Sequence, residues 1–166
     1  MTENRRQNFS NPAKTARTGA MNAAVRILTH RDHSKYELKR KLQQRSFASE
    51  VIDAVVLECE RLDYIDDKRT ARVYISQLKR KRFGKRHIRM SLKKKRLYSA
   101  AIEDILLENY AKIEERKNAD QLLEKKKKTF NREKDLKKRR DKIYRFLYSR
   151  GFNKDIIADL IRDLVK

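Results

Sequence analysis

A five-position apolar pattern occurs three times in the sequence, each time with successive spacings of 4, 5, 5 and 3 residues. Its copies are Leu38, Leu42, Phe47, Ile52 and Val55; Ile88, Leu92, Leu97, Ile102 and Ile105; and Ile143, Leu147, Phe152, Ile157 and Leu160. Such internal repetition is typical of proteins that stack one small structural unit against the next. The repeat therefore constrains the fold more than any single motif does.

The spacing within each copy indicates helices, because residues four apart lie on one helix face. An upstream segment also recurs: Ala24, Val25 and Leu28 match Tyr74, Ile75 and Leu78, and more loosely Leu122, Leu123 and Lys126. Three glycines and one proline leave few of the special turns that a β-rich fold uses. We predict an all-α protein of three tandem three-helix repeats in an elongated, curved array.

The predicted repeats cover residues 20–65, 66–111 and 112–166, after a disordered basic tail at residues 1–19. The third repeat carries an insertion near residues 125–138, which either extends two helices or forms a charged loop. Ser34 and Glu37 form a capping-box pattern at a helix start. Asp66 and Asp67 are expected to cap the helix they open rather than to form a catalytic or metal-binding pair.

Gly151 is expected to end a helix in the left-handed backbone conformation. The equivalent positions in the other repeats hold Ser46 and Arg96. The sequence therefore predicts that this turn closes differently in the first two repeats.

Charge is distributed unevenly along the chain, whose formal net charge is +22. The first repeat carries +1, whereas the second and third carry +9 each, and residues 79–96 hold eleven Lys or Arg and no acid. A stripe of Arg86, Arg89, Lys93 and Arg96 is expected to face outward. Such runs often only solvate a helix face, but missing acids favour an anionic partner such as nucleic acid.

The residues predicted to contact DNA or a nucleoprotein filament are Lys79, Arg80, Arg82, Lys85, Arg86, Arg89, Lys93, Arg96, Lys126, Lys127, Arg139 and Arg140. Phosphate contacts of this kind hold a protein on nucleic acid without reading sequence. Six aromatic residues offer either base stacking or core packing, and core packing is expected for most: Tyr74, Phe83, Tyr98, Phe130, Tyr144 and Tyr148.

Nothing in the sequence indicates an enzyme, a metal or a cofactor. His30 and His33 have no further ligand at metal-binding spacing, and Cys59 falls on an apolar helix face as a small core residue. Common phosphate-binding and nucleophile motifs are missing. The single cysteine, the lack of a membrane-length apolar run and the polar N-terminus predict a cytoplasmic protein without membrane contact.

Several short motifs, in order, resemble the RecX regulatory proteins over residues 20–166. They are the ELKRKL run at residues 37–42, Tyr64-Ile65-Asp66-Asp67 followed by Arg69 and Ala71, Phe83-Gly84 before Ile88 and Leu92, and YRFLYSRGF at residues 144–152. Asp63 stands where the family commonly has glycine, and Thr70 where it commonly has an aromatic residue.

The resemblance implies a cytoplasmic, non-enzymatic modulator of the RecA recombinase that acts in DNA repair, recombination and the SOS response. Such proteins are built from three-helix repeats, lie in the groove of the RecA filament on single-stranded DNA, and inhibit strand exchange, ATPase and coprotease activity. The expected partners are thus the RecA filament and single- or double-stranded DNA, bound by a monomer. Two alternatives remain open: a general sequence-independent nucleic-acid-binding protein, and a helical scaffold for an acidic protein.

Overall fold

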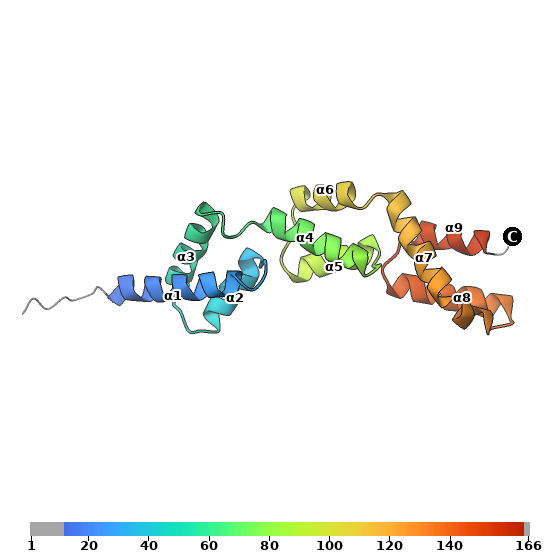
Figure 1. Ribbon diagram of the computed structural model, residues 1–166, viewed down its shortest axis with the longest axis horizontal. Coiled ribbons are helices and arrows are strands. Elements are labelled where there is room, and N and C mark those ends of the chain that lie inside the picture. The colour runs from blue at the N-terminus through green and yellow to red at the C-terminus, as the bar shows by residue number, and fades with distance from the viewer. Residues whose placement is uncertain (1–11, 165–166) are drawn as a thin grey trace, which may run out of the picture. The chain divides into compact units, whose positions relative to one another are not determined.

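The computed structural model describes residues 12–164, and every regular element in this part of the chain is an α-helix (Figure 1). The helices are α1 (Pro12–Leu28), α2 (Lys35–Gln43), α3 (Ser49–Arg61), α4 (Asp67–Arg80), α5 (Lys85–Lys94), α6 (Ala100–Asn109), α7 (Lys112–Asn131), α8 (Leu136–Ser149) and α9 (Lys154–Asp163). They fall into three sets of three, which confirms the predicted all-α repeat fold.

The chain divides into two compact units. The first ends at Asp67 and contains the first repeat, whereas the second begins at Lys68 and contains the second and third repeats together. The second unit therefore holds both of the strongly basic repeats.

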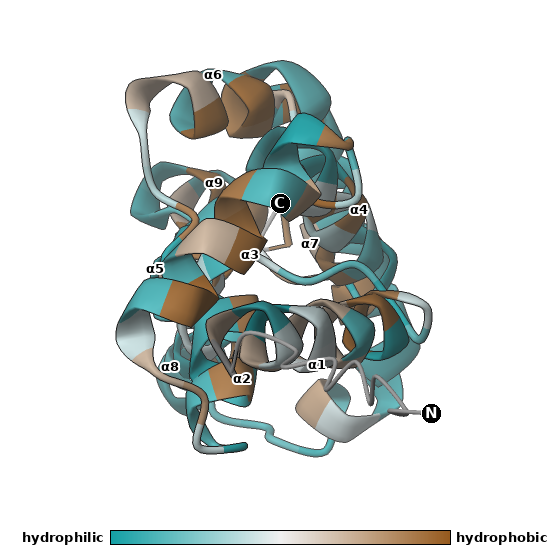
Figure 2. Cartoon of the chain, turned by 90° about the vertical axis from the view of Figure 1, so that its left-hand side faces the viewer, coloured by the Kyte–Doolittle hydropathy of each residue, from teal (hydrophilic) through white to brown (hydrophobic). Residues whose placement is uncertain are grey.

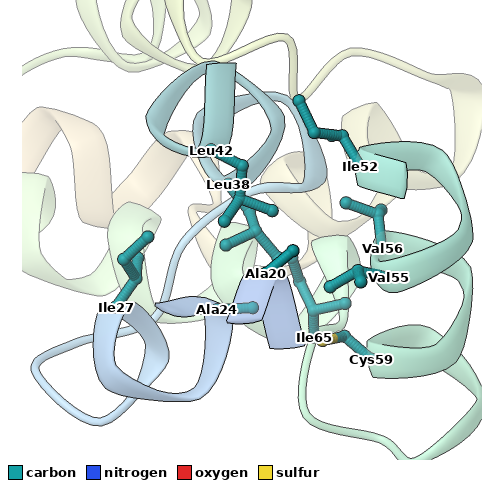
Figure 3. Packing of buried hydrophobic residues seen from close by; sticks show 10 residues of the cluster. All are labelled: Ala20, Ala24, Ile27, Leu38, Leu42, Ile52, Val55, Val56, Cys59 and Ile65. Carbon is teal, nitrogen blue, oxygen red and sulfur yellow. The ribbon is translucent and has the colours of Figure 1, made fainter. Parts of the chain in front are cut away.

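The core of the first repeat gathers apolar side chains from all three of its helices (Figure 3). Helix α1 turns Ala20, Ala24 and Ile27 inward, so Val25 is exposed and the predicted register there is wrong by one position. Phe47 is only partly buried against this core. Cys59 is fully buried with its Sγ 3.8 Å from the Met21 Sδ, which confirms its core role, and burial raises the pKa of its thiol.

The second and third repeats each have a core of their own. All ten apolar pattern positions predicted for these two repeats are buried. Helices such as α3, α5 and α6 carry both hydrophilic and hydrophobic residues along one ribbon, as expected when a single face of each helix packs inward (Figure 2).

One turn geometry closes the second helix of every repeat. Ser46, Arg96 and Gly151 all have positive φ, at 59°, 58° and 83°. In each of these residues, the amide donates to the carbonyl three residues earlier. In the last two repeats the amide of the next residue, Leu97 or Phe152, also donates to a carbonyl of the preceding helix, and that residue is buried. The prediction of a different turn in the first two repeats is wrong, because in all three repeats the left-handed corner turns an apolar residue, Phe47, Leu97 or Phe152, against its core.

Two positions where the sequence departs from the family pattern keep the local structure. Asp63 adopts a φ of 55°, the left-handed conformation that glycine accommodates with less strain. Thr70 is buried in α4. Both substitutions are therefore compatible with the repeat.

Two predictions about segment boundaries are decided by the structure. Helix α1 begins at Pro12, so residues 12–19 are helical and not a disordered tail; residues 1–11 lie outside the described part of the chain. The insertion in the third repeat extends both helices, since α7 continues to Asn131 and α8 begins at Leu136. Asp135 caps α8 by accepting the amides of Lys137 and Lys138.

Replacing Ser46 by glycine is expected to raise the free energy of unfolding by about 0.5 to 1 kcal/mol. The left-handed conformation costs an L-residue roughly 1–2 kcal/mol, and the greater freedom of glycine in the unfolded chain offsets part of that gain. Ser46→Ala is the control, because it keeps the Cβ and hence the strain. Denaturant unfolding monitored by circular dichroism measures both, and an equal effect of the two variants would contradict the turn geometry.

Candidate nucleic-acid interface

The second and third repeats meet at two glycines whose backbones touch. The Gly84 amide donates to the Arg150 carbonyl and the Arg86 amide donates to the Gly151 carbonyl, both at 3.0 Å. A Cβ on Gly84 would overlap the Gly151 backbone, and a Cβ on Gly151 would overlap His87. Only glycine permits this approach, so the two residues join the repeats backbone to backbone.

A fully buried carboxylate completes this joint. Glu115 Oε1 accepts the amide of Lys85 at 2.9 Å, and Oε2 accepts the side-chain amide of Asn153 at 3.4 Å. Glu115 lies near the start of α7; Lys85 is the first residue of α5, and Asn153 directly precedes α9 as its N-cap. Burial raises the pKa of Glu115, because removing a carboxylate from water disfavours its charged form.

Asp67 makes the equivalent contact in the first unit. Its Oδ1 accepts the amide of Lys35, the first residue of α2, at 2.9 Å. The sequence prediction assigned this carboxylate to the helix it opens, whereas its hydrogen bond caps α2. An acidic residue at the start of a repeat was visible in the sequence, but which helix start it faces depends on packing.

The basic stripe predicted on α5 is only partly exposed. The Arg86 guanidinium lies 3.6 Å from the centroid of the Tyr148 ring and donates to the Tyr148 carbonyl. Arg89 forms a two-pronged ion pair with Glu103, with its Nε 2.9 Å from Oε2. Both arginines are thus half-buried and have partners within the second unit, an aromatic ring for Arg86 and a carboxylate for Arg89.

Other predicted contact residues are also engaged within the second unit. The Lys79 ammonium pairs with Glu114 at 2.9 Å beside the Tyr110 ring. Arg82 reaches the Gln121 side chain at 3.4 Å. Lys85 and Arg139 are partly buried. Lys79 and Arg82 thus have partners within the second unit, and Lys85 and Arg139 are less accessible to a ligand than a fully exposed cation is.

The remaining predicted cations are exposed, and they lie near helix ends in the second unit. Arg80, Lys93 and Arg96 lie at the ends of α4 and α5. Lys126, Lys127 and Arg140 belong to a larger exposed group, here called the basic hairpin, at the connected ends of α7 and α8. Its members are Lys125, Lys126, Lys127, Lys128, Arg132, Lys134, Lys137, Lys138 and Arg140.

Acidic side chains offset little of the charge on the basic hairpin. Lys127 pairs with Glu124 at 3.1 Å, and Glu133 pairs with Lys142. Exposed ion pairs of this kind are weak, so they do not hold the hairpin cations away from another anion. A chain of phosphates is the ligand class that such a closely spaced cationic surface attracts most strongly.

Residues 12–164 contain neither a membrane-spanning helix nor a metal-binding cluster. No helix in that range is long and apolar enough to cross a membrane. His33 is buried with its Nδ1 2.8 Å from the Arg31 carbonyl, and nowhere in the described chain do three or more His, Cys, Asp or Glu side chains gather closely enough to hold a metal ion.

Comparison with known proteins gives consistent similarities. Residues 20–59 and 114–161 match the first and third three-helix domains of RecX. The chain is 34% identical to the regulatory protein RecX of Haemophilus influenzae (strain PittGG) over 143 residues, which span 86% of this chain and 92% of that protein. RecX of Legionella pneumophila (strain Corby) is 32% identical over 149 residues, covering 89% and 95% of the two chains.

A solved structure shows the same fold. The crystal structure of RecX from Lactobacillus salivarius matches with a TM-score of 0.82 over 90% of this chain and 97% of that one, at 24% identity.

Glu115→Gln is expected to remove a pH dependence from the stability of the protein. The folded pKa of Glu115 is raised above its usual 4.5, so the folded state holds this proton more tightly than the unfolded state. The contribution of protonated Glu115 to the free energy of unfolding is complete below pH 4.5, and it is lost as the pH rises through the raised pKa. As the pH rises from 4.5, the parent should therefore lose stability relative to the Gln variant.

Glu115→Ala is the companion variant. It leaves the part-buried Lys85 amide without its acceptor and should cost about 1–3 kcal/mol at low pH, with a smaller cost as the pH rises through the raised pKa of Glu115. Urea unfolding at a series of pH values measures both variants. A constant difference between the Gln variant and the parent across the series would show that folding does not shift the pKa of Glu115.

Proposed function

We propose, because the chain belongs to the RecX family of regulatory proteins, that it binds the RecA filament on single-stranded DNA. Binding would inhibit the recombinase, ATPase and coprotease activities of the filament. In this proposal the protein acts in the cytoplasm as a monomer and catalyses no reaction. The family membership supports the RecA partner. The charge distribution supports the DNA contact.

The observation that carries the DNA contact is the basic hairpin together with the exposed cations of α4 and α5. Both groups lie in the second unit. The Gly84–Gly151 backbone contact and the buried Glu115 join the two repeats that bear them. Several cations held in one compact unit bind a phosphate chain more strongly than the same cations on independent segments, because less freedom is lost on binding.

Inhibition in this proposal requires occupancy alone. Phosphate contacts are independent of sequence, so the protein is able to follow a filament along any DNA. The first unit carries a charge of only +1 over residues 20–65, and it is the part proposed to contact protein more than DNA. A bound molecule would then obstruct strand exchange by its position.

A second candidate is a sequence-independent coat for nucleic acid that acts without RecA. The exposed basic hairpin is the observation that favours it. Such a coat competes for bare strand, so its effect depends on reaching the DNA before RecA does. The two candidates therefore differ in the order of addition.

Reversing three exposed cations, Lys93, Lys126 and Arg140, to glutamate is expected to weaken DNA binding and to flatten its salt dependence. Each phosphate contact contributes about 0.7 to 0.9 to the slope of log K against log salt, so the triple variant should lose about 2. Fluorescence anisotropy with a labelled oligonucleotide at several salt concentrations measures the slope.

The matched control reverses three exposed arginines of the first unit, Arg26, Arg40 and Arg45. It changes the net charge equally, so it corrects for the long-range effect of charge. Equal losses in the two triple variants, with circular dichroism showing both folded, would count against a DNA-binding surface in the second unit.

RecA assembled on single-stranded DNA before the protein is added should still be inhibited, at less than one molecule per RecA. A filament binder acts on assembled RecA, whereas a coat finds no bare strand to occupy. The rate of ATP hydrolysis by preloaded RecA gives the readout. The absence of any effect up to equimolar protein would overturn the RecA proposal and leave the coat as the candidate.

A further inference from the structure

A groove of about 300 Å³ lies between α5 and α6 in the second repeat. Leu92, Leu97 and Ile102 give it an apolar lining, and Tyr98 stands at its edge in the turn before α6. Tyr98 is 57% exposed. An aromatic ring beside an open apolar groove is a surface on which another flat ring stacks.

Most of the other aromatic residues of the second unit have their faces covered. The Phe83 ring stacks on His87 with centroids 3.9 Å apart, and the Arg150 guanidinium lies over it at 4.9 Å. Tyr148 has Arg86 over it at 3.6 Å and Tyr144 stacked at 5.7 Å. A base would have to displace these groups before it could stack.

Of the six candidate aromatics, Tyr74 and Phe130 are engaged as well. The Lys95 ammonium lies 4.9 Å from the centroid of the Tyr74 ring, and Phe130 packs against Phe146 in the third core. For Tyr98, by contrast, the described part of the chain shows no ring contact. Of the six candidate aromatics, Tyr98 alone among the described residues combines exposure with an uncovered ring.

The charges around the groove select an anionic ligand. Exposed Lys93 lines it, and it lies within the acid-free run of residues 79–96. Glu103 is the one acid that lines the groove, and its charge is neutralised by the two-pronged pair with Arg89. A ligand that suits this site carries a flat apolar ring and a nearby negative charge.

A nucleotide of single-stranded DNA has both features, whereas the bases of a duplex are already stacked and paired. We propose that Tyr98 is a stacking platform for one unpaired base, with Lys93 contacting the adjoining phosphate. This inference rests on the proposed DNA contact and adds to it a preference for single strands. Stacking is tolerant of sequence because every base has an aromatic face.

The test compares Tyr98→Ala and Tyr98→Phe on two labelled oligonucleotides of equal length, one of thymidines and one abasic. Tyr98→Ala should bind the thymidine strand about 5- to 150-fold more weakly than the parent, as loss of one stacked base predicts. Its affinity for the abasic strand and the salt slope on both strands should be unchanged, because no phosphate contact is removed. Tyr98→Phe keeps the ring and should retain the affinity.

Tyr64→Ala is the matched control, since Tyr64 is 49% exposed but belongs to the nearly neutral first repeat. It should bind both strands as the parent does. A direct reporter is also available, because the chain has no tryptophan. The fluorescence of Tyr98→Trp should be quenched by the thymidine strand and not by the abasic one, whereas Tyr64→Trp should respond to neither.

The results separate this inference from the proposed DNA contact. If Tyr98→Ala binds the thymidine strand as the parent does, the stacking site is overturned and the cationic contact stands. The same conclusion follows if the variant loses affinity equally for both strands, or if its melting temperature falls, since the residue then acts through the fold. If the parent binds neither strand, both proposals fail.

Discussion

The structure depends on a carboxylate that the first helix of one repeat offers to the second helix of the repeat before it. A helix begins with amides that have no partner within the helix, and here a carboxylate from a later point in the chain accepts the first of them. Asp67 accepts the first amide of α2, and Glu115 accepts the first amide of α5. Burial raises the pKa of both carboxylates, so each contact carries a cost of desolvation that its hydrogen bonds offset only in part.

In the second unit this contact brings two chain segments close enough that only glycines fit. Gly84 and Gly151 share backbone hydrogen bonds there, and Arg86 crosses the joint to lie on Tyr148. The joint explains why a run of cations without acids is stable. Part of the run is neutralised or stacked internally, and the rest is distributed over surfaces where water screens repulsion.

The cations thus have two roles that their sequence positions do not separate. Arg86 and Arg89 hold neighbouring elements together, whereas Lys93, one turn further along α5, is exposed. The same division applies to the aromatic residues. Phe83 is covered on its ring while Tyr98 is open, although both flank α5. The cationic and aromatic side chains available to a ligand are therefore those that are not engaged in contacts within the fold.

By itself the sequence determined the all-α class, the repeated three-helix pattern, most of the buried apolar positions and the capping box at Ser34, since each depends on contacts between residues near one another in the chain. Only the tertiary structure decided which helix Asp67 caps, that Glu115 is buried, and that Ser46 and Arg96 take the left-handed turn of Gly151. It also decided which cations face solvent. These features depend on what another helix or turn places opposite a residue, and periodicity along one helix carries no record of that neighbour.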